Sequence, residues 1–169
     1  MQTWTTVADK AAWGDGPWVD EPDKVQWVDQ ATGLTCLAKR SGTSGSWCGY
    51  VGVHADHPLH GRDYDSDAAG HLEVHGGLTY ADGCQEDERP IEHRVCHIPA
   101  PGEPDDVWWF GFDCAHCRDY SPAMAACMTA VGVPYDRLYG EEYRTLAYVQ
   151  AECADLAKQL ADVAAGDAS

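Results

Sequence analysis

The chain has 169 residues, with 28 acidic and 11 basic side chains and a formal net charge of −17 at neutral pH. This length suits one domain with its own hydrophobic core, and an apolar content of 44% argues against a disordered chain. The acidic charge argues against direct binding of nucleic acid or of an anionic membrane, since both require clustered Lys and Arg. No apolar run approaches the roughly 20 residues of a membrane-spanning helix.

Residues 1–24 are predicted to be an irregular N-terminal segment, because turn-forming residues recur at 14–17 and 21–23. The first residues, Met1–Thr6, have neither the basic start nor the apolar core of a signal peptide. We therefore expect the protein in the cytoplasm, with its eight cysteines in the reduced state.

The middle of the chain has the alternation and the turn signals of an antiparallel sheet. Residues 25–29 and 34–38 are predicted strands joined by a hairpin turn at 30–33, and residues 54–70 form a long polar loop. Further strands are predicted at 47–53, 71–80, 91–98 and 107–112.

Two helices are predicted after the sheet, a short one at 123–130 and a long one at 141–164. Apolar residues recur at helical spacing along the long helix: Tyr143, Leu146, Ala147, Val149, Cys153, Leu156, Ala157 and Leu160. The sequence thus predicts one α+β domain over residues 1–169, in which a mostly antiparallel, twisted sheet carries the C-terminal helix.

The predicted strand at 107–112 ends in a group of reactive side chains: Asp113, Cys114, His116 and Cys117. The Cys114–Cys117 spacing is that of a zinc-binding pair, of a redox dithiol or of two packed thiols. The redox alternative is disfavoured, because the thioredoxin-like fold needs a βαβ unit before the motif, and hairpins are predicted there. A structural zinc site would take further ligands from Cys84, from Cys96 and His97, or from His75.

A catalytic metal site is also consistent with these residues. His75, Asp113 and His116 would bind zinc or another divalent metal, with Cys114 as a further donor, and would leave one position open for water. Cys114 beside either histidine is also compatible with a thiol–imidazole pair.

Gly76 and Gly77 directly follow His75, and successive glycine amides can bind an anion. From the polar loop, His57 and Arg62 are predicted to contribute to the same ligand site, since Arg is suited to phosphate and carboxylate groups. The alternatives are a strand bulge with a half-buried histidine, and an Arg62 paired with a neighbouring aspartate.

The polar loop also resembles the start of a calcium-binding loop, because Asp63, Asp65 and Asp67 alternate. The pattern then fails. Ala68 stands where the turn glycine belongs, and Val74 stands where the bidentate glutamate belongs, so an EF-hand is not expected.

Four blocks of the sequence resemble a family of small uncharacterised proteins from bacteriophages of actinobacteria. They are Cys48–Val53, His57–Asp65, Val74–Tyr80 and Trp108–His116. The resemblance implies a phage accessory protein that works in the host cytoplasm. It emphasises Asp113, Cys114 and His116 more than Cys117, which favours the grouping of His75, Asp113 and His116 over the Cys-x-x-Cys pair.

Two functions from different classes follow from these observations. One is a metal-binding protein that acts as a small hydrolase of a nucleotide-like or phosphoester substrate. The other is a non-catalytic binding protein that blocks a host or defence factor through its acidic surface, or sequesters a small anionic signalling nucleotide. In the second case a basic host protein is the expected partner and any zinc is structural.

Overall fold

The computed structural model describes residues 1–85, 88–103, 105–133, 135 and 141–167. Six strands in this part of the chain form one antiparallel sheet in the order β1-β2-β3-β4-β6-β5. The strands are β1 Gln2–Trp4, β2 Lys24–Val28, β3 Thr35–Arg40, β4 Trp47–Val53, β5 Tyr80–Gly83 and β6 Trp108–Asp113. The α-helices are α1 Pro122–Ala130 and α2 Leu146–Asp167, and single 3-10 turns occur at Lys10–Trp13, Pro17–Val19 and Ile91–His93. The predicted α+β architecture is confirmed.

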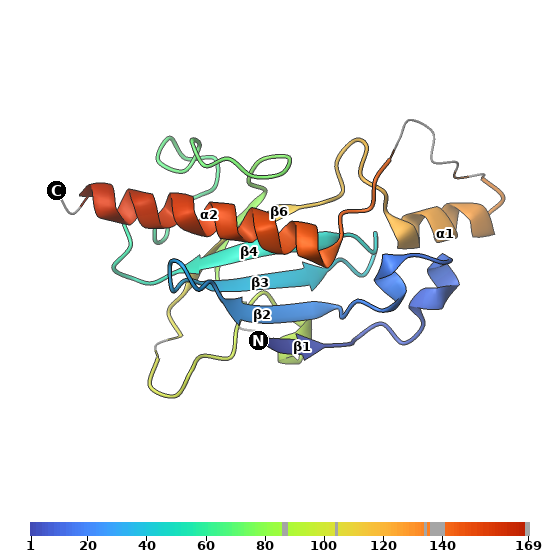
Figure 1. Ribbon diagram of the computed structural model, residues 1–169, viewed down its shortest axis with the longest axis horizontal. Helices are drawn as coiled ribbons and strands as arrows, with labels where there is room; N and C mark the ends of the chain where they lie inside the picture. The colour runs from blue at the N-terminus through green and yellow to red at the C-terminus, as the bar shows by residue number, and fades with distance from the viewer. Residues whose placement is uncertain (86–87, 104, 134, 136–140, 168–169) are drawn as a thin grey trace.

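The C-terminal helix α2 packs along one face of the sheet, over β3 and β4 (Figure 1). Its buried stripe has helical spacing and consists of Val149, Cys153, Leu156, Ala157 and Leu160, each with 0% exposure. The helix begins five residues later than predicted. Thr145 supplies the N-cap, since its hydroxyl oxygen accepts the N–H of Tyr148 at 3.3 Å and its carbonyl accepts the N–H of Val149 at 3.1 Å.

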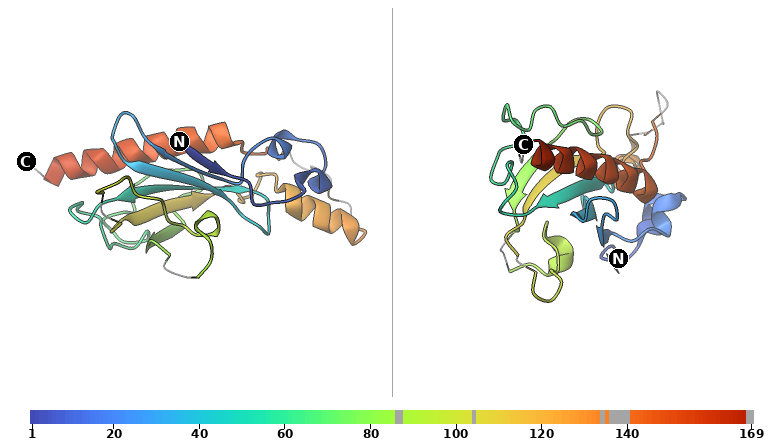
Figure 2. Two further views of the ribbon diagram at one scale, coloured as in Figure 1. Left: turned by 90° about the horizontal axis from the view of Figure 1, so that it is seen from below. Right: turned by 60° about the vertical axis from the view of Figure 1, so that its left-hand side comes forward.

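A second, smaller core lies on the opposite face of the sheet, where the segment 84–107 covers the strands (Figure 2). Its buried residues are Leu37, Tyr50, Val95, Val107 and Trp109. Lys24, which is 0% exposed, fixes this segment, because its ammonium group donates to the carbonyls of Arg94 at 3.0 Å and Cys96 at 2.7 Å. Burial lowers the pKa of Lys24 to about 8. The prediction of a strand at 91–98 is therefore wrong. Carbonyl groups of this stretch accept hydrogen bonds from the Lys24 side chain instead of from a neighbouring strand.

Two further predictions are corrected by the structure. Residues 71–79 form no strand and include a turn at 75–76, and only Tyr80–Gly83 of this region joins the sheet. Gly76 and Gly77 have φ values of +68° and +88°, which no strand adopts. Conversely, the N-terminal segment predicted to be irregular contains β1, which pairs with β2 from Gln2 to Trp4. In the described part of the chain, neither α-helix combines the length and the apolar character that crossing a bilayer requires.

A buried ionic network around Arg40 joins the N-terminal segment to the start of α2. Arg40, 4% exposed, contacts Asp23 at 3.0 Å, Glu21 at 3.1 Å and the hydroxyl of Tyr143 at 2.7 Å. Its guanidinium also stacks on the ring of Trp47 at 4.4 Å. Glu21 in turn accepts the first N–H of α2, from Leu146, at 2.8 Å. Glu21 therefore pairs with Arg40 and positions the helix at the same time.

We predict that Arg40→Met destabilises the fold by about 3–5 kcal/mol, because Glu21 loses its paired cation and the buried Asp23 keeps only Lys10 of its two cations. Urea denaturation measures the loss in the free energy of unfolding. The matched control is Lys158→Met on the exposed side of α2, which should change that free energy by no more than about 0.5 kcal/mol. Equal stability of the two variants would contradict the assigned role of Arg40.

The same network predicts the response of the fold to acid. Burial alone would raise the pKa values of Glu21 and Asp23, but the hydrogen bonds that they accept have the larger, opposite effect. Glu21 accepts from Tyr143 and Leu146. Asp23 accepts from Val7 and Lys10. Both pKa values therefore lie below the ordinary 4.5 and 3.8. A depressed folded-state pKa gives stability that is complete above the unfolded pKa and is lost as the pH falls through the folded value. We expect the contribution of these two carboxylates to the free energy of unfolding to be constant above about pH 5 and to decline steeply below about pH 4. The difference between wild type and Arg40→Met should narrow over the same decline.

Candidate functional site

Strand β6 ends at Asp113, and a tight turn carries the chain from there to Asp119. The carboxylate of Asp113 accepts the N–H of Ala115 at 3.0 Å, and the N–H of Asp119 donates to the carbonyl of His116 at 2.9 Å. Asp119 is 5% exposed and points back into the protein. The end of β6 therefore presents polar side chains, as the sequence predicts.

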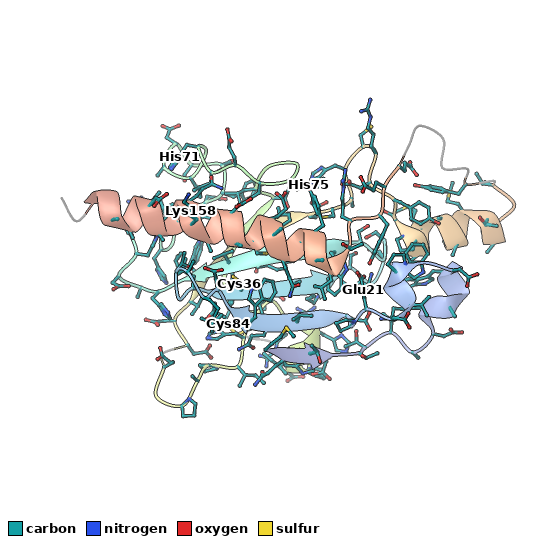
Figure 3. All side chains as sticks on the ribbon, viewed as in Figure 1. Glu21, Cys36, His71, His75, Cys84 and Lys158 are labelled. Carbon is teal, nitrogen blue, oxygen red and sulfur yellow. A yellow bond between two sulfur atoms is a disulfide. The ribbon has the colours of Figure 1, made fainter. Side chains whose placement is uncertain are left out.

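His75 reaches this turn from the loop that precedes β5, and its ring lies next to α2 (Figure 3). Its Nε2 lies 2.7 Å from Oδ2 of Asp119, and its Nδ1 lies 3.0 Å from the hydroxyl of Tyr148. The backbone N–H of His75 donates to Glu152 at 2.8 Å. Both ring nitrogens of His75 are therefore hydrogen-bonded within the chain.

Asp119 is the centre of this group. Besides His75, it accepts hydrogen bonds from Arg144 at 2.8 Å and from the N–H of His116 at 3.1 Å. Burial alone would raise the pKa of Asp119, but these hydrogen bonds outweigh it and hold the pKa below its usual range. Because an ionised carboxylate only accepts, His75 carries a proton on Nε2. The Tyr148 hydroxyl, 3.0 Å from Nδ1, is also hydrogen-bonded to Glu152.

His116 lies against Gly76. Its ring centroid is 5.7 Å from that of His75, and its Nε2 lies 3.8 Å from Asp113, too far for a hydrogen bond. This Nε2 is buried without a hydrogen-bond partner in the described structure. Gly76 has to be glycine, because a Cβ there would lie 2.0 Å from Nε2 of His116.

The structure thus gathers His75, Asp113 and His116 at one end of β6. Cys114 follows Asp113 but is only 1% exposed, and burial raises the pKa of its thiol well above the usual range. Metal binding by these four residues stays a prediction. Asp119 and Tyr148 were missed by sequence reasoning. Asp119 shares the polar turn after β6, which was a usable signal, whereas no pattern singles out Tyr148.

The other predicted ligand residues make contacts within the chain. His57 accepts the N–H of Leu59 on Nδ1 at 3.1 Å, so its Nε2 donates to the carbonyl of Leu160 at 2.9 Å and fastens the loop to α2. The carbonyl of Arg62 accepts the indole N–H of Trp108 at 2.9 Å. Ligand binding by Gly76, Gly77, Arg62 and His57 stays a prediction.

A second group of metal-ligating side chains lies at the other end of β6. It consists of Cys84, Cys96, His97 and Asp105, and one ligand atom from each lies within 4.8 Å of the other three. Among the described residues, this is the group whose ligand atoms lie close enough to hold one metal ion. Cys84 follows Gly83, which pairs with Trp108 at the start of β6, whereas Cys114 follows the strand's end. Cys114 and Cys117 are therefore not part of this group.

Cys84 and Cys96 form a disulfide, and the other six cysteines are free thiols. The prediction that all eight are reduced is thus wrong for this pair. Nδ1 of His97 lies 3.9 Å from the sulfur of Cys84 and 3.7 Å from Asp105, and Asp105 lies 3.6 Å from the same sulfur. Burial is the main cause that lowers the pKa of His97, so its imidazole is held neutral, as a metal ligand must be.

A cavity of about 640 Å³ adjoins this second group, within the range of small-molecule sites. His97 lines both the cavity and the cysteine group, and Trp27 and Ile98 contribute apolar wall. His54 also lines the cavity, and its Nδ1 is buried without a hydrogen-bond partner in the described structure.

Comparison with models of protein families, with curated proteins and with solved structures finds no match to this chain.

The glycine pair gives a matched test of the geometry around His116. Both glycines have positive φ, so either alanine substitution costs about 1–2 kcal/mol of backbone strain. A Cβ at Gly77 meets nothing within 4 Å, whereas one at Gly76 collides with His116. We predict that Gly76→Ala destabilises the protein by a further roughly 1–3 kcal/mol.

Thermal or urea unfolding of the two variants measures this difference. Adding His116→Ala to each variant should remove the extra cost at Gly76 and leave the cost at Gly77 unchanged. An equal loss at both glycines would show that His116 does not lie against Gly76.

Proposed function

We propose that this protein binds zinc through Cys84, Cys96, His97 and Asp105 when the disulfide between the two cysteines is reduced. The observation that carries the proposal is the convergence of four ligand atoms within 4.8 Å of one another. Two thiolates, an imidazole and a carboxylate are the donor types that zinc selects in proteins.

The distances support a tetrahedral site. Ligand atoms bound at 2.0–2.3 Å to one zinc ion lie roughly 3.3–3.8 Å apart. The Cys84–Asp105, Cys84–His97 and His97–Asp105 atom pairs lie at 3.6, 3.9 and 3.7 Å. The main movement required is the separation of the two sulfur atoms, which are bonded to each other in the disulfide.

The chemistry of that movement is a two-electron reduction. A dithiol reductant transfers two electrons and two protons to the disulfide, which gives two thiols and one oxidised dithiol. Zinc then displaces one proton from each thiol and binds the two thiolates. Metal and disulfide are therefore alternative cross-links between the same two residues.

The position of the site supports a structural role for the zinc. All four ligands belong to the segment 84–105, which covers the second core. A metal there would hold this cover on the sheet under reducing conditions, as the disulfide does under oxidising ones. Reducing conditions prevail in the cytoplasm, and we propose, on the resemblance to phage proteins, that this chain works there.

We further propose, on the charge and on that resemblance, that the protein is a phage accessory protein that binds a basic host protein. The net charge of −17 favours a cationic partner through long-range attraction and disfavours a small anionic ligand.

Zinc titration of the protein reduced with dithiothreitol tests the metal site. We expect one zinc per chain and the release of two protons for each zinc bound. At free zinc 100 times the Kd, the free energy of unfolding should rise by about 2.7 kcal/mol, which corresponds to an increase in Tm of roughly 5–10 °C. Elemental analysis after gel filtration measures the stoichiometry.

Matched cysteine variants locate the site. Cys84→Ser and Cys96→Ser should lose the bound zinc, as should His97→Gln. Cys117→Ser is the control, because Cys117 is an exposed free thiol of the Cys-x-x-Cys pair. Zinc binding lost in Cys117→Ser but kept in Cys84→Ser would move the site to the end of β6, and no binding by the reduced wild type would exclude the proposal.

A further inference from the structure

The first cluster, formed by His75, Asp119 and Tyr148 beside the end of β6, also allows chemistry that involves no metal. A buried carboxylate, an imidazole and a hydroxyl follow one another at hydrogen-bond distance: Asp119 to His75 at 2.7 Å, and His75 to Tyr148 at 3.0 Å. We propose that Tyr148 is a nucleophile for neutral, activated carboxylic esters, with His75 as its general base and Asp119 as the positioning residue. In nucleophilic catalysis these roles require a nucleophile in contact with a base, and a third group that orients the base.

The direction of the proton transfer is set by Asp119. Its two oxygens already accept from Arg144 and from the N–H of His116, so this carboxylate is an acceptor on every side that is described. A ring proton of His75 therefore lies on Nε2, and Nδ1 lies 3.0 Å from the Tyr148 hydroxyl, which also has Glu152 as a hydrogen-bond partner. Burial and the neighbouring Glu152 raise the pKa of Tyr148, so the side chain is a phenol that needs a base to lose its proton on attack.

The base is also held in place by contacts with its neighbours. Its backbone N–H donates to Glu152, its ring packs edge-on against Tyr148 with the ring centroids 5.5 Å apart, and the centroid of His116 lies 5.7 Å from its own. Tyr148 lies in the first turn of α2, whose N-cap hydrogen-bonds its N–H. Base and nucleophile are thus fixed by different elements before any substrate arrives.

The surroundings favour a neutral substrate. Carboxylates dominate around the hydroxyl, since Asp119 and Glu152 contact the base. The cation that stacks on Tyr148, Arg144, is already paired with Asp119 and Glu142 at 2.8 and 2.9 Å. A phosphoester would therefore be repelled both locally and by the net charge of −17.

The reaction balances without a cofactor. The Tyr148 oxygen attacks the ester carbonyl carbon while its proton passes to Nδ1 of His75. The bond between the carbonyl carbon and the leaving-group oxygen then breaks, and the imidazolium returns the proton to that oxygen. The product is an acyl ester on Tyr148 and a free alcohol or phenol. Water, with His75 again as the base, releases the carboxylic acid.

p-Nitrophenyl acetate tests the nucleophile directly. We expect a burst of p-nitrophenolate and acetylation of Tyr148, detected by peptide mass spectrometry. Tyr64 is the matched internal control, because it is 39% exposed and lies on the polar loop. Tyr148 should be acetylated at least ten-fold faster than Tyr64, and Tyr148→Phe should abolish the burst. A rate at Tyr148 no greater than at Tyr64 would overturn the proposal.

Variants of the base and of the positioning residue separate chemistry from structure. His75→Ala should slow acetylation of Tyr148 by about 10²-fold or more, and added imidazole should restore part of that rate. In Asp119→Asn only one of the two oxygens remains, so the side chain cannot accept hydrogen bonds from both Arg144 and His75. We therefore expect the ring proton of His75 to move to Nδ1 and the rate of Tyr148 acetylation to fall at least ten-fold. The ¹⁵N shifts of His75 report that tautomer. A folded His75→Ala or Asp119→Asn protein that retains the full rate would exclude the relay.

The reaction at Tyr148 should not depend on the proposed zinc site. Wild-type protein freed of metal with a chelator is expected to keep the burst and the acetylation of Tyr148. A burst that disappears when the metal is removed while the protein stays folded would assign the reaction to a metal site instead of to Tyr148.

Discussion

The burial of Arg40 is the constraint on which the rest of this structure depends. A guanidinium removed from water must find anionic and carbonyl partners, and no single neighbouring segment supplies enough of them. The N-terminal segment provides Glu21 and Asp23, the turn before β4 provides the carbonyl of Gly45, and the approach to α2 provides Tyr143. Three parts of the chain that are distant in sequence are brought together by one side chain.

This network also determines where the first cluster lies. Tyr143 points inward to Arg40, and the next residue, Arg144, points to Asp119. Glu21 holds the N–H of Leu146, which fixes the first turn of α2 and therefore the position of Tyr148 beside His75. The contacts with Arg40 and the contacts around His75 are thus only a few residues apart in the chain. A displacement of one set would also displace the other.

The architecture could be predicted from the sequence because its signals are local. The hairpin of β2 and β3, the apolar β6 and the periodic stripe of α2 each follow from hydrophobic spacing within one element. Residues 71–79 alternate like a strand, but the left-handed conformation of Gly76 and Gly77 removes them from the sheet. β1 is too short to show a period, and it becomes a strand because β2 offers it a free side.

The site was predictable only in part, for a physical reason. His75, Asp113 and His116 lie at or near a predicted strand end, so their proximity could be inferred from the sequence. The partners of His75 come from elsewhere, and Tyr148 meets it because α2 crosses the sheet at a particular angle and register. The contact between Cys84 and Cys96 depends likewise on how an irregular segment folds over the second core, which hydrophobic spacing does not encode.

The order of the strands has a consequence for self-association. The outermost strands, β1 and β5, have three and four residues, whereas the longer, more apolar strands β3, β4 and β6 lie inside the sheet. An edge this short offers few unpaired amides and carbonyls to the strand of another molecule, which limits edge-to-edge growth into aggregates. Asp82, exposed on β5, adds a charge to one of these edges. The sheet thus remains open at both edges without offering a long template for the addition of further chains.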